Sequence, residues 1–316
     1  MIIFFLYYQR ILEIASAAGY QGENLLKYVR IATINLEIKL GVFFSCFLWI
    51  VNIGSFVPLY ILIDDFCKKN RRLFIVNFVL ASSVVFGIAS FCLSGARFGL
   101  MQMMLFGLTV FLQKKIFAQE KIGKLFVLVI IFLIILVTIM SVLLSVRLGD
   151  ENRSVFQLFC VYIGSPIVAL SSWLEVGNES SLLGEESFFG LRVILHSLFS
   201  NIELTSQFNE FTIFPGGGST NIYTAYRAFI SDFGWFGMAF LNFIIGFVYA
   251  SAYNGLVQKF CPRNILIYNF FFFYLLSMIF SPLVTSSLFT TTQIMGCFWL
   301  LIIGWWLMGK SFVQNS

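Results

Sequence analysis

Long apolar runs separated by short polar segments dominate the chain. A helix that crosses a membrane needs about 20 mostly apolar residues. Seven segments meet or approach that length, at residues 40–63, 73–94, 98–113, 125–146, 233–256, 264–281 and 292–309. Unbroken apolar runs favour helices over the alternating strands of a membrane barrel. The pattern therefore predicts an all-α, polytopic integral membrane protein with about seven transmembrane helices.

Basic residues in the short loops predict the orientation of these spans, because cytoplasmic loops are enriched in lysine and arginine. They follow the first, third, fifth and seventh spans: Lys68, Lys69, Arg71, Arg72, Lys114, Lys115, Lys121, Lys124, Lys259, Arg263 and Lys310. We expect these loops and the C-terminus inside, and residues 9–39 outside. Asp64 and Asp65, beside the first basic loop, are interpreted as part of a solvated charged loop.

The first eight residues, MIIFFLYY, are apolar but too short to span a membrane. They lack the basic start of a signal peptide. We expect them to be the end of a helix whose beginning, with one or more further spans, precedes this sequence. The alternative is a protein of seven spans whose N-terminus lies outside.

The longest segment between spans, residues 147–228, divides the chain into three parts. Residues 1–146 are predicted as an N-terminal transmembrane bundle, 147–228 as a large outer loop, and 229–316 as a C-terminal bundle. Loops of this length are usually functional. Inside the loop, residues 155–174 are predicted as two short interfacial or re-entrant helices, the second starting at Pro166. An added span at this place would reverse every later loop.

Two further helices are expected around the end of the loop. Residues 188–201 predict a short amphipathic helix with Arg192 and His196 on one face. A glycine-rich turn follows, and the next helix carries Tyr223 and Arg227, again four residues apart. The candidates for its N-terminal cap are Ser219, Thr220 and Asn221.

Composition narrows the class of protein. Apolar residues make up 59% of the chain, charged residues 11%, and the mean hydropathy is +0.91. A soluble globule of this size has too little interior for so much apolar surface, which excludes a soluble enzyme. The net charge of +5 is scattered between apolar runs, so we expect no nucleic-acid partner. No His, Cys and carboxylate cluster has metal-ligand spacing, so neither a metal nor another cofactor is expected.

Arginine and lysine are distributed differently. Eight of the lysines lie on the predicted cytoplasmic side, whereas seven arginines lie outside. Arginine forms bidentate hydrogen bonds to phosphate or carboxylate, so these arginines suggest an anionic ligand on the outer side. The alternative is that they pair with carboxylates of the loop or reach lipid headgroups. Arg97, after Ser94-Gly95-Ala96, lies in an apolar stretch and is a functional candidate by its membrane depth.

Three motifs resemble bacterial oligosaccharide repeat-unit polymerases, which include the Wzy-type O-antigen polymerases. Ser94-Gly95-Ala96-Arg97 is similar to the small-residue-plus-arginine motif after a span of that family. Asn221 to Arg227, followed by Asp232-Phe233-Gly234-Trp235-Phe236-Gly237, is similar to its Asn-x-Tyr-Thr … Asp-Phe-Gly-x-x-Gly signature. Residues 162–183, with Ser165-Pro166, resemble its large periplasmic loop. The resemblance covers roughly residues 10–305.

The resemblance implies an undecaprenyl-diphosphate-dependent glycosyltransferase in the bacterial inner membrane, with its site facing the periplasm. Its partners would be a lipid-linked glycan donor and acceptor, membrane lipid and a chain-length regulator protein. An O-antigen ligase and a lipid-linked oligosaccharide flippase or transporter remain open as alternatives.

This chemistry suggests roles for individual residues. We expect Arg97 and Arg227 to clamp the diphosphate, with Arg192 as a third contact to phosphate or sugar. His196, the single histidine, is the expected base for the acceptor hydroxyl. The remaining candidates are Asp232 as an alternative base, Tyr223 for a sugar or phosphate contact, and Asn221 from the matched motif.

Overall fold

The computed structural model describes residues 2–22, 25, 28–29, 32, 41–70, 72–93, 97–120, 123, 125–132, 134–135, 138–139, 155–176, 184–199, 212–213, 219–220, 223–278, 294–302 and 305. The chain forms two compact units, residues 1–159 with 298–316 and residues 160–297. Helices dominate the described residues, which confirms the all-α prediction. Strand structure in this part is limited to β1 (Thr212–Ile213) and β2 (Ser219–Thr220), which pair antiparallel.

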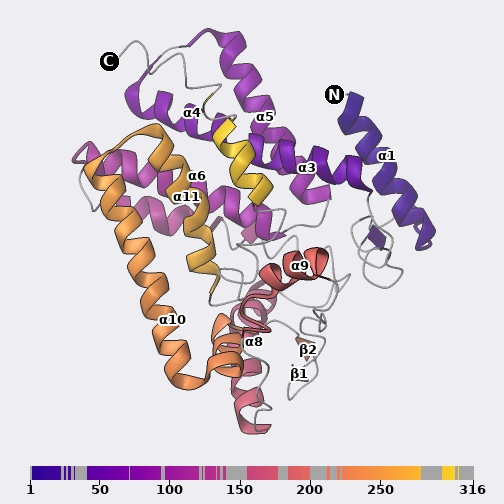
Figure 1. The fold of residues 1–316 in the computed structure, drawn as a ribbon. Coiled ribbons are helices and arrows are strands. Elements are labelled where there is room, and N and C mark those ends of the chain that lie inside the picture. The colour runs from indigo at the N-terminus through magenta and orange to yellow at the C-terminus, as the bar shows by residue number, and fades with distance from the viewer. Residues whose placement is uncertain are drawn as a thin grey trace. The chain divides into compact units, whose positions relative to one another are not determined.

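Four helical stretches of the described residues are long and apolar enough to cross a membrane: Phe43–Lys68, Phe74–Leu93, Gly99–Phe117 and Ala225–Gln258. The first combines α3 (Val42–Gly54) and α4 (Phe56–Lys68), and the others lie in α5 (Phe74–Leu93), α6 (Arg97–Phe117) and α10 (Ala225–Gln258) (Figure 1). They correspond to the first, second, third and fifth expected spans. The other three expected spans run partly outside the described residues and stay predictions.

In the first unit, small and polar residues let α5 approach the junction of α3 and α4. Gly87 of α5 lies so close to Ser55 that an added Cβ would be 2.5 Å from the Ser55 Cβ. The Ser90 hydroxyl donates a hydrogen bond to the Asn52 side-chain oxygen across the same contact. Small residues allow close packing of membrane helices, where apolar burial alone gives no preference for helix contact over lipid contact.

The helix α1 (Ile2–Ala17) contains the apolar N-terminal residues. Tyr7, Ile11 and Ala15 form a buried cluster with Leu48 of α3 and Val29. At 16 residues, α1 is about 24 Å long. Residues 2–8 therefore belong to a helix that continues to Ala17, and its buried face packs in the first unit.

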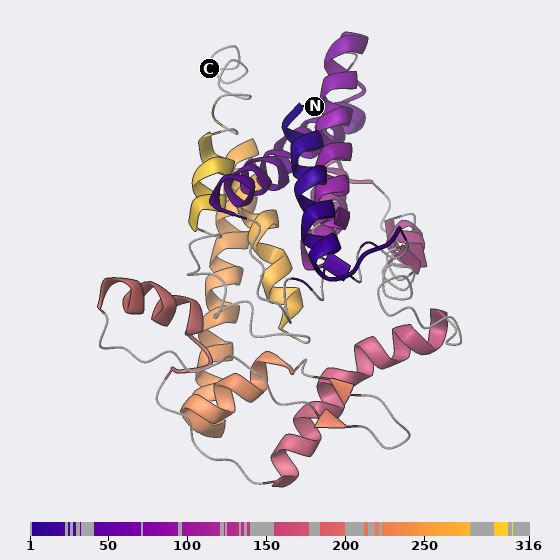
Figure 2. The same ribbon diagram turned by 90° about the vertical axis from the view of Figure 1, so that its right-hand side faces the viewer.

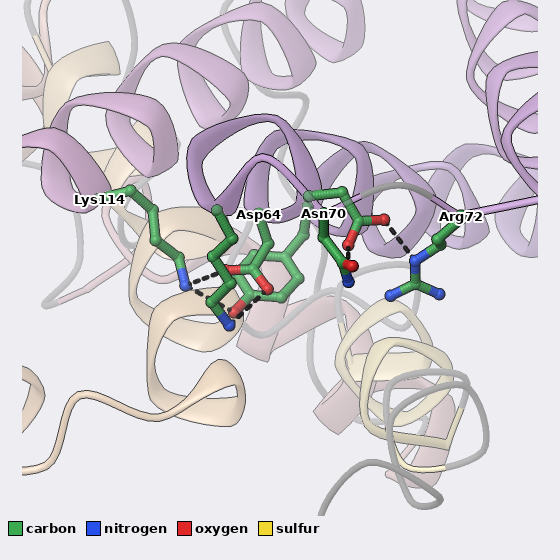
Figure 3. A network of polar contacts seen from close by, with 7 residues as sticks. Asp64, Asn70, Arg72 and Lys114 are labelled. Atoms are coloured by element: carbon green, nitrogen blue, oxygen red, sulfur yellow. Dashed lines mark hydrogen bonds and ion pairs between the residues drawn. The ribbon is translucent and has the colours of Figure 1, made fainter.

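Ion pairs gather at the C-terminal end of α4 (Figure 3). The Asp64 carboxylate lies 2.5 Å from the Lys114 amine of α6 and 2.9 Å from the Lys68 amine. Lys114 also donates to the Tyr60 hydroxyl at 3.2 Å. Each charge of this group thus has an opposite charge or a polar atom beside it, and the contacts tie α4 to α6.

The neighbouring Asp65 is buried and pairs with Arg72, while the Asn70 amide donates to the second carboxylate oxygen at 3.4 Å (Figure 3). The expected solvated loop at Asp64 and Asp65 is therefore wrong. Both residues lie in α4, near its C-terminal end. Their neighbours supply positive charge, which offsets the free energy needed to withdraw a carboxylate from water.

The helix α8 (Val155–Val176) is continuous and contains Pro166, so the prediction of two short helices is wrong. Proline removes one backbone donor and strains the preceding turn, but apolar residues on both sides continue the helix. With 22 residues, α8 is about 33 Å long, enough to cross a bilayer. Length therefore does not argue against a span at this place.

The second unit also contains α9 (Phe189–Leu198), which confirms the helix expected over residues 188–201. The following long helix, α10, is interrupted at Gly234, whose φ is 66° and ψ is −175°. Figures 1 and 2 show the resulting bend between a short first part, residues 225–233, and a long second part, residues 235–258. The helix α11 (Pro262–Ser277) packs along α10. The Tyr249 hydroxyl of α10 donates to the Phe271 carbonyl of α11 at 2.8 Å.

The start of α10 differs from the expectation. Thr224 is the N-cap residue, and Tyr223 lies just before the helix. Ser219 and Thr220 belong to β2, so the prediction that one of them caps this helix is wrong. Asn221 lies outside the described residues. The Ala225 amide donates instead to the Met278 carbonyl at 2.9 Å, so tertiary contact with the end of α11 satisfies an N-terminal amide of α10.

Candidate functional site

The candidate site is built around a turn, Gly184–Phe188, that precedes α9. Gly184 has a φ of 76°, a left-handed conformation that glycine adopts without strain. Asp232, near the end of the short part of α10, accepts hydrogen bonds from the Glu186 amide at 3.2 Å and the Ser187 amide at 2.7 Å. Asp232 is only 6% exposed and Ser187 is fully buried. The carboxylate therefore fixes the backbone of the turn from 45 residues away.

Two glutamates of this turn approach two of the predicted arginines. The Glu185 carboxylate lies 3.2 Å from the Arg192 guanidinium of α9. The Glu186 carboxylate lies 4.0 Å from the Arg227 guanidinium of α10. The alternative that outer arginines pair with carboxylates of the loop is thus what the structure has at Arg192 and Arg227.

Arg227 lies against two aromatic rings. Its guanidinium carbon is 4.0 Å from the centre of the Tyr223 ring and 5.4 Å from the centre of the Trp173 ring of α8. The side chain is 5% exposed. Ring faces carry partial negative charge and stabilise a cation at such distances. The 4.0 Å separation from Glu186 exceeds a hydrogen-bond length, so this carboxylate balances charge at that nitrogen without bonding it directly.

The segment Asp232 to Gly237 shapes the bend that follows the site. Phe233 packs edge-to-face on Phe188 of the turn, with ring centres 6.1 Å apart. Gly234 supplies the positive φ, and a Cβ on Gly237 would lie 2.1 Å from the Phe233 Cβ. Four residues of this motif therefore each have a structural role. Asp232 anchors the turn and Phe233 packs on it, while Gly234 breaks the helix and Gly237 leaves room for the Phe233 side chain.

Exposed aromatic residues just after the bend are typical of the boundary between a span and water. Trp235 and Phe236 are strongly exposed at the start of the long part of α10. That part is 24 residues long by its bounds, residues 235–258, or about 36 Å. Aromatic residues are enriched where a span meets water. Arg227 and Asp232 precede this boundary and lie in the short part of the helix.

The structure brings together four of the seven predicted site residues in the second unit: Arg192, Arg227, Tyr223 and Asp232. His196 lies one turn after Arg192 in the last turn of α9 and is half-buried. Arg97 is the first residue of α6 in the first unit, and the contacts of its side chain lie outside the described part of the chain. Asn221 is likewise outside it. Among the described residues, no group of three His, Cys, Asp or Glu side chains has the geometry to hold a metal ion.

Sequence reasoning did not single out Trp173, Glu185 or Glu186. In the sequence, the two glutamates look like any other carboxylates of the loop. A signal exists in hindsight, because the adjacent pair follows a glycine and precedes an amphipathic helix that carries Arg192. For Trp173 no local pattern distinguishes it from other aromatic residues in apolar helices.

The arrangement can bind an anion. An arginine guanidinium is always charged and offers a planar set of donors that matches phosphate. Here the aromatic rings limit its orientation, and low exposure strengthens any electrostatic contact. No family model, curated protein or solved structure matches the chain.

Proposed function

We propose that this chain polymerises undecaprenyl-diphosphate-linked oligosaccharide repeat units at the periplasmic face of the bacterial inner membrane, releasing undecaprenyl diphosphate. The observation that carries the proposal is Arg227, buried against two rings in the short helix before an apolar span. A lipid diphosphate keeps its chain in the bilayer and its charges at the boundary. A permanent cation beside an apolar span fits a lipid diphosphate better than it fits a soluble anion.

The reaction assigns a role to each candidate. A hydroxyl of the acceptor repeat unit attacks the anomeric carbon of the donor, and the bond from that carbon to the diphosphate oxygen breaks. The proton of the hydroxyl passes to His196. Negative charge grows on the leaving diphosphate, and Arg227, with Arg192, stabilises it; the same role for Arg97 stays a prediction.

The contacts of Asp232 favour His196 over Asp232 as the base. Each Asp232 oxygen accepts a backbone hydrogen bond, so both oxygens are engaged in holding the turn. Imidazole is the side chain that most often serves as a general base in enzymes. Tyr223, which packs against Arg227, orients the guanidinium and lies next to the place where the diphosphate would bind.

The test is the surface polysaccharide ladder of a strain that lacks this gene. Complementation uses the wild type, Arg227→Ala, Arg97→Ala and His196→Ala. Arg10→Ala is the matched control, because this partly exposed arginine of the first unit pairs with Glu13 on its own helix. The proposal expects lipid A-core with a single repeat unit in the deletion strain. The ladder should return with the wild type and Arg10→Ala, and fail with the other three variants.

Other outcomes separate the alternatives. Loss of every cap, including the single unit, would indicate a ligase or a flippase in place of a polymerase. A ladder restored by Arg227→Ala would refute the diphosphate role of this residue. A ladder that the deletion leaves unchanged would refute O-antigen polymerisation and direct the search to capsule, exopolysaccharide or transport.

A further inference from the structure

One side of α9 carries an exposed stripe of large apolar residues. Leu191, Ile194, Leu195 and Leu198 recur at the spacing that places residues on one side of a helix. Leu191 and Leu198 are 37% and 68% exposed, and Phe199, directly after the helix, is 60% exposed. Neighbouring large apolar side chains are unfavourable in water, so an exposed group of this kind indicates a contact surface.

The polar residues of α9 lie on a different side. Arg192 and His196 are four residues apart, so they share a face. Arg192, the one charged residue in the sequence of this helix, pairs with Glu185 of the turn at 3.2 Å. A helix with an apolar stripe beside a basic face is typical of segments that lie in a membrane interface. At ten residues, α9 is about 15 Å long, too short to cross a bilayer.

The start of α9 is held at the level of the bend in α10. Phe188, directly before α9, packs on Phe233, directly before the bend, with ring centres 6.1 Å apart. Asp232 accepts a hydrogen bond from the Ser187 amide at 2.7 Å. The long apolar part of α10 begins at the exposed Trp235, two residues after Phe233. The helix α9 therefore begins at the same level as the end of this span.

The direction of α9 keeps it near that level. Figures 1 and 2 both show α9 lying across the direction of the long part of α10. Exposed rings continue along the long part of α10, among them Phe236, Phe240 and Phe243. A span with such a face is surrounded by lipid. The surface of the same bilayer is therefore close to the exposed stripe of α9.

We infer that α9 is an interfacial helix, which docks its stripe of Leu191, Ile194, Leu195 and Leu198 on the membrane leaflet at which α10 enters. The occupant of the stripe is the lipid surface. The inference goes beyond the proposed reaction, because it depends only on the apolar span in α10 and on the exposed face of α9. It places the shared face of Arg192 and His196 at the level of the lipid headgroups.

The experiment measures the surroundings of single positions on α9 in the full chain. The six native cysteines are replaced by serine, and a bimane fluorophore is attached to Leu191→Cys, Leu198→Cys or Val193→Cys. Val193 is the matched control, because it is 37% exposed, as Leu191 is, and lies about 200° around the helix from it. Each protein is purified in mild detergent and reconstituted into vesicles of phosphatidylethanolamine and phosphatidylglycerol.

Two quenchers report on lipid and on water. One is phospholipid brominated on the acyl chain near the headgroup, because interfacial helices reach about 5–10 Å into the boundary between headgroups and chains. The other is iodide, present on both sides of the vesicles. We expect the labels at Leu191 and Leu198 to lose most of their fluorescence to brominated lipid and little to iodide. The label at Val193 should show the reverse.

Three results would overturn the inference. Quenching of all three labels by iodide alone would mean that α9 lies in water and that its stripe is left for a protein partner. Quenching of all three by brominated lipid alone would mean that the helix is immersed in the bilayer. Lipid quenching at Val193 and iodide quenching at Leu191 would mean that the opposite face docks. Leu198→Cys carries the test if the Leu191 variant is not recovered as a monodisperse protein.

Discussion

The bend in α10 yields a sharp test of the structure, through the substitution Gly234→Ala. At φ 66° and ψ −175°, Gly234 occupies a region of backbone conformation that is essentially restricted to glycine. A Cβ added there meets no atom within 4 Å, so steric contact with neighbours contributes nothing. The whole cost is backbone strain, about 1–3 kcal/mol for a residue held in such a region.

The matched control is Gly246→Ala in the same helix. A Cβ at Gly246 also meets no atom within 4 Å, and its backbone is helical. Alanine is favoured over glycine in a helix interior by about 0.5–1 kcal/mol. The two variants therefore make the same chemical change and should shift stability in opposite directions.

The assay is thermal unfolding of the purified chain in mild detergent, read as loss of the monodisperse peak in size-exclusion chromatography. Gly234→Ala should unfold at a lower temperature than the wild type, and Gly246→Ala at the same or a higher temperature. A Gly234→Ala midpoint at or above that of Gly246→Ala would mean that α10 is straight. A straight helix of 34 residues would be about 51 Å long, and the assignment of Arg227 to a short helix outside the span would then fail.

Three further outcomes are expected. Gly87→Ala should lower the unfolding midpoint through overpacking that costs about 1–3 kcal/mol, because the new Cβ would lie 2.5 Å from the Ser55 Cβ. The double variant with Ser55→Gly should recover the midpoint, and no recovery would contradict the close contact. Lys114→Met should lower the free energy of unfolding by about 1–3 kcal/mol, because it removes a charged partner of Asp64 at 2.5 Å. Adding Asp64→Asn should restore part of that loss, and no restoration would contradict the ion pair. Lys259 is expected on the cytoplasmic side. In a background with the six native cysteines replaced by serine, Lys259→Cys should therefore react with an impermeant maleimide only after the cells are opened. Reaction in intact cells would mean that α8 spans the membrane and reverses the later loops.

Apolar periodicity predicted the helical spans well, because the length of an apolar run is a property of local sequence. The spans at 73–94 and 98–113 correspond to α5 and α6 within a few residues. The helix at 188–201 was also predicted from its amphipathic pattern. In each case the information lies in neighbouring residues, so no knowledge of the fold is needed.

The interruption of α8 was predicted at Pro166 and does not occur. A proline costs a helix roughly 3 kcal/mol, yet contacts along the rest of the segment can outweigh a single lost hydrogen bond. The N-cap of α10 was missed for a similar reason. Its first amide bonds to the Met278 carbonyl, and a partner more than 50 residues away leaves no trace in local sequence.

The candidate site was predicted in its arginines and in Asp232, and missed in its two glutamates. Arg192 and Arg227 stood out because they oppose the charge bias of membrane proteins. Glu186 did not stand out, because an acidic residue in an outer loop needs no special explanation. Its role depends on the turn that Asp232 holds, and such a contact emerges only when the chain is folded.

The ion pairs at the end of α4 have a consequence for the order in which the chain is made. Lys114 follows Asp64 by 50 residues, which corresponds to about 3–10 s of synthesis at common ribosomal rates. Lys68, one helical turn from Asp64, leaves the ribosome almost together with it. The nascent helix therefore has a counter-ion for Asp64 from the start, and Lys114 joins only when α6 has been made. Lys68, which duplicates the charge of Lys114 in the finished protein, thus balances the Asp64 carboxylate while the chain is being made.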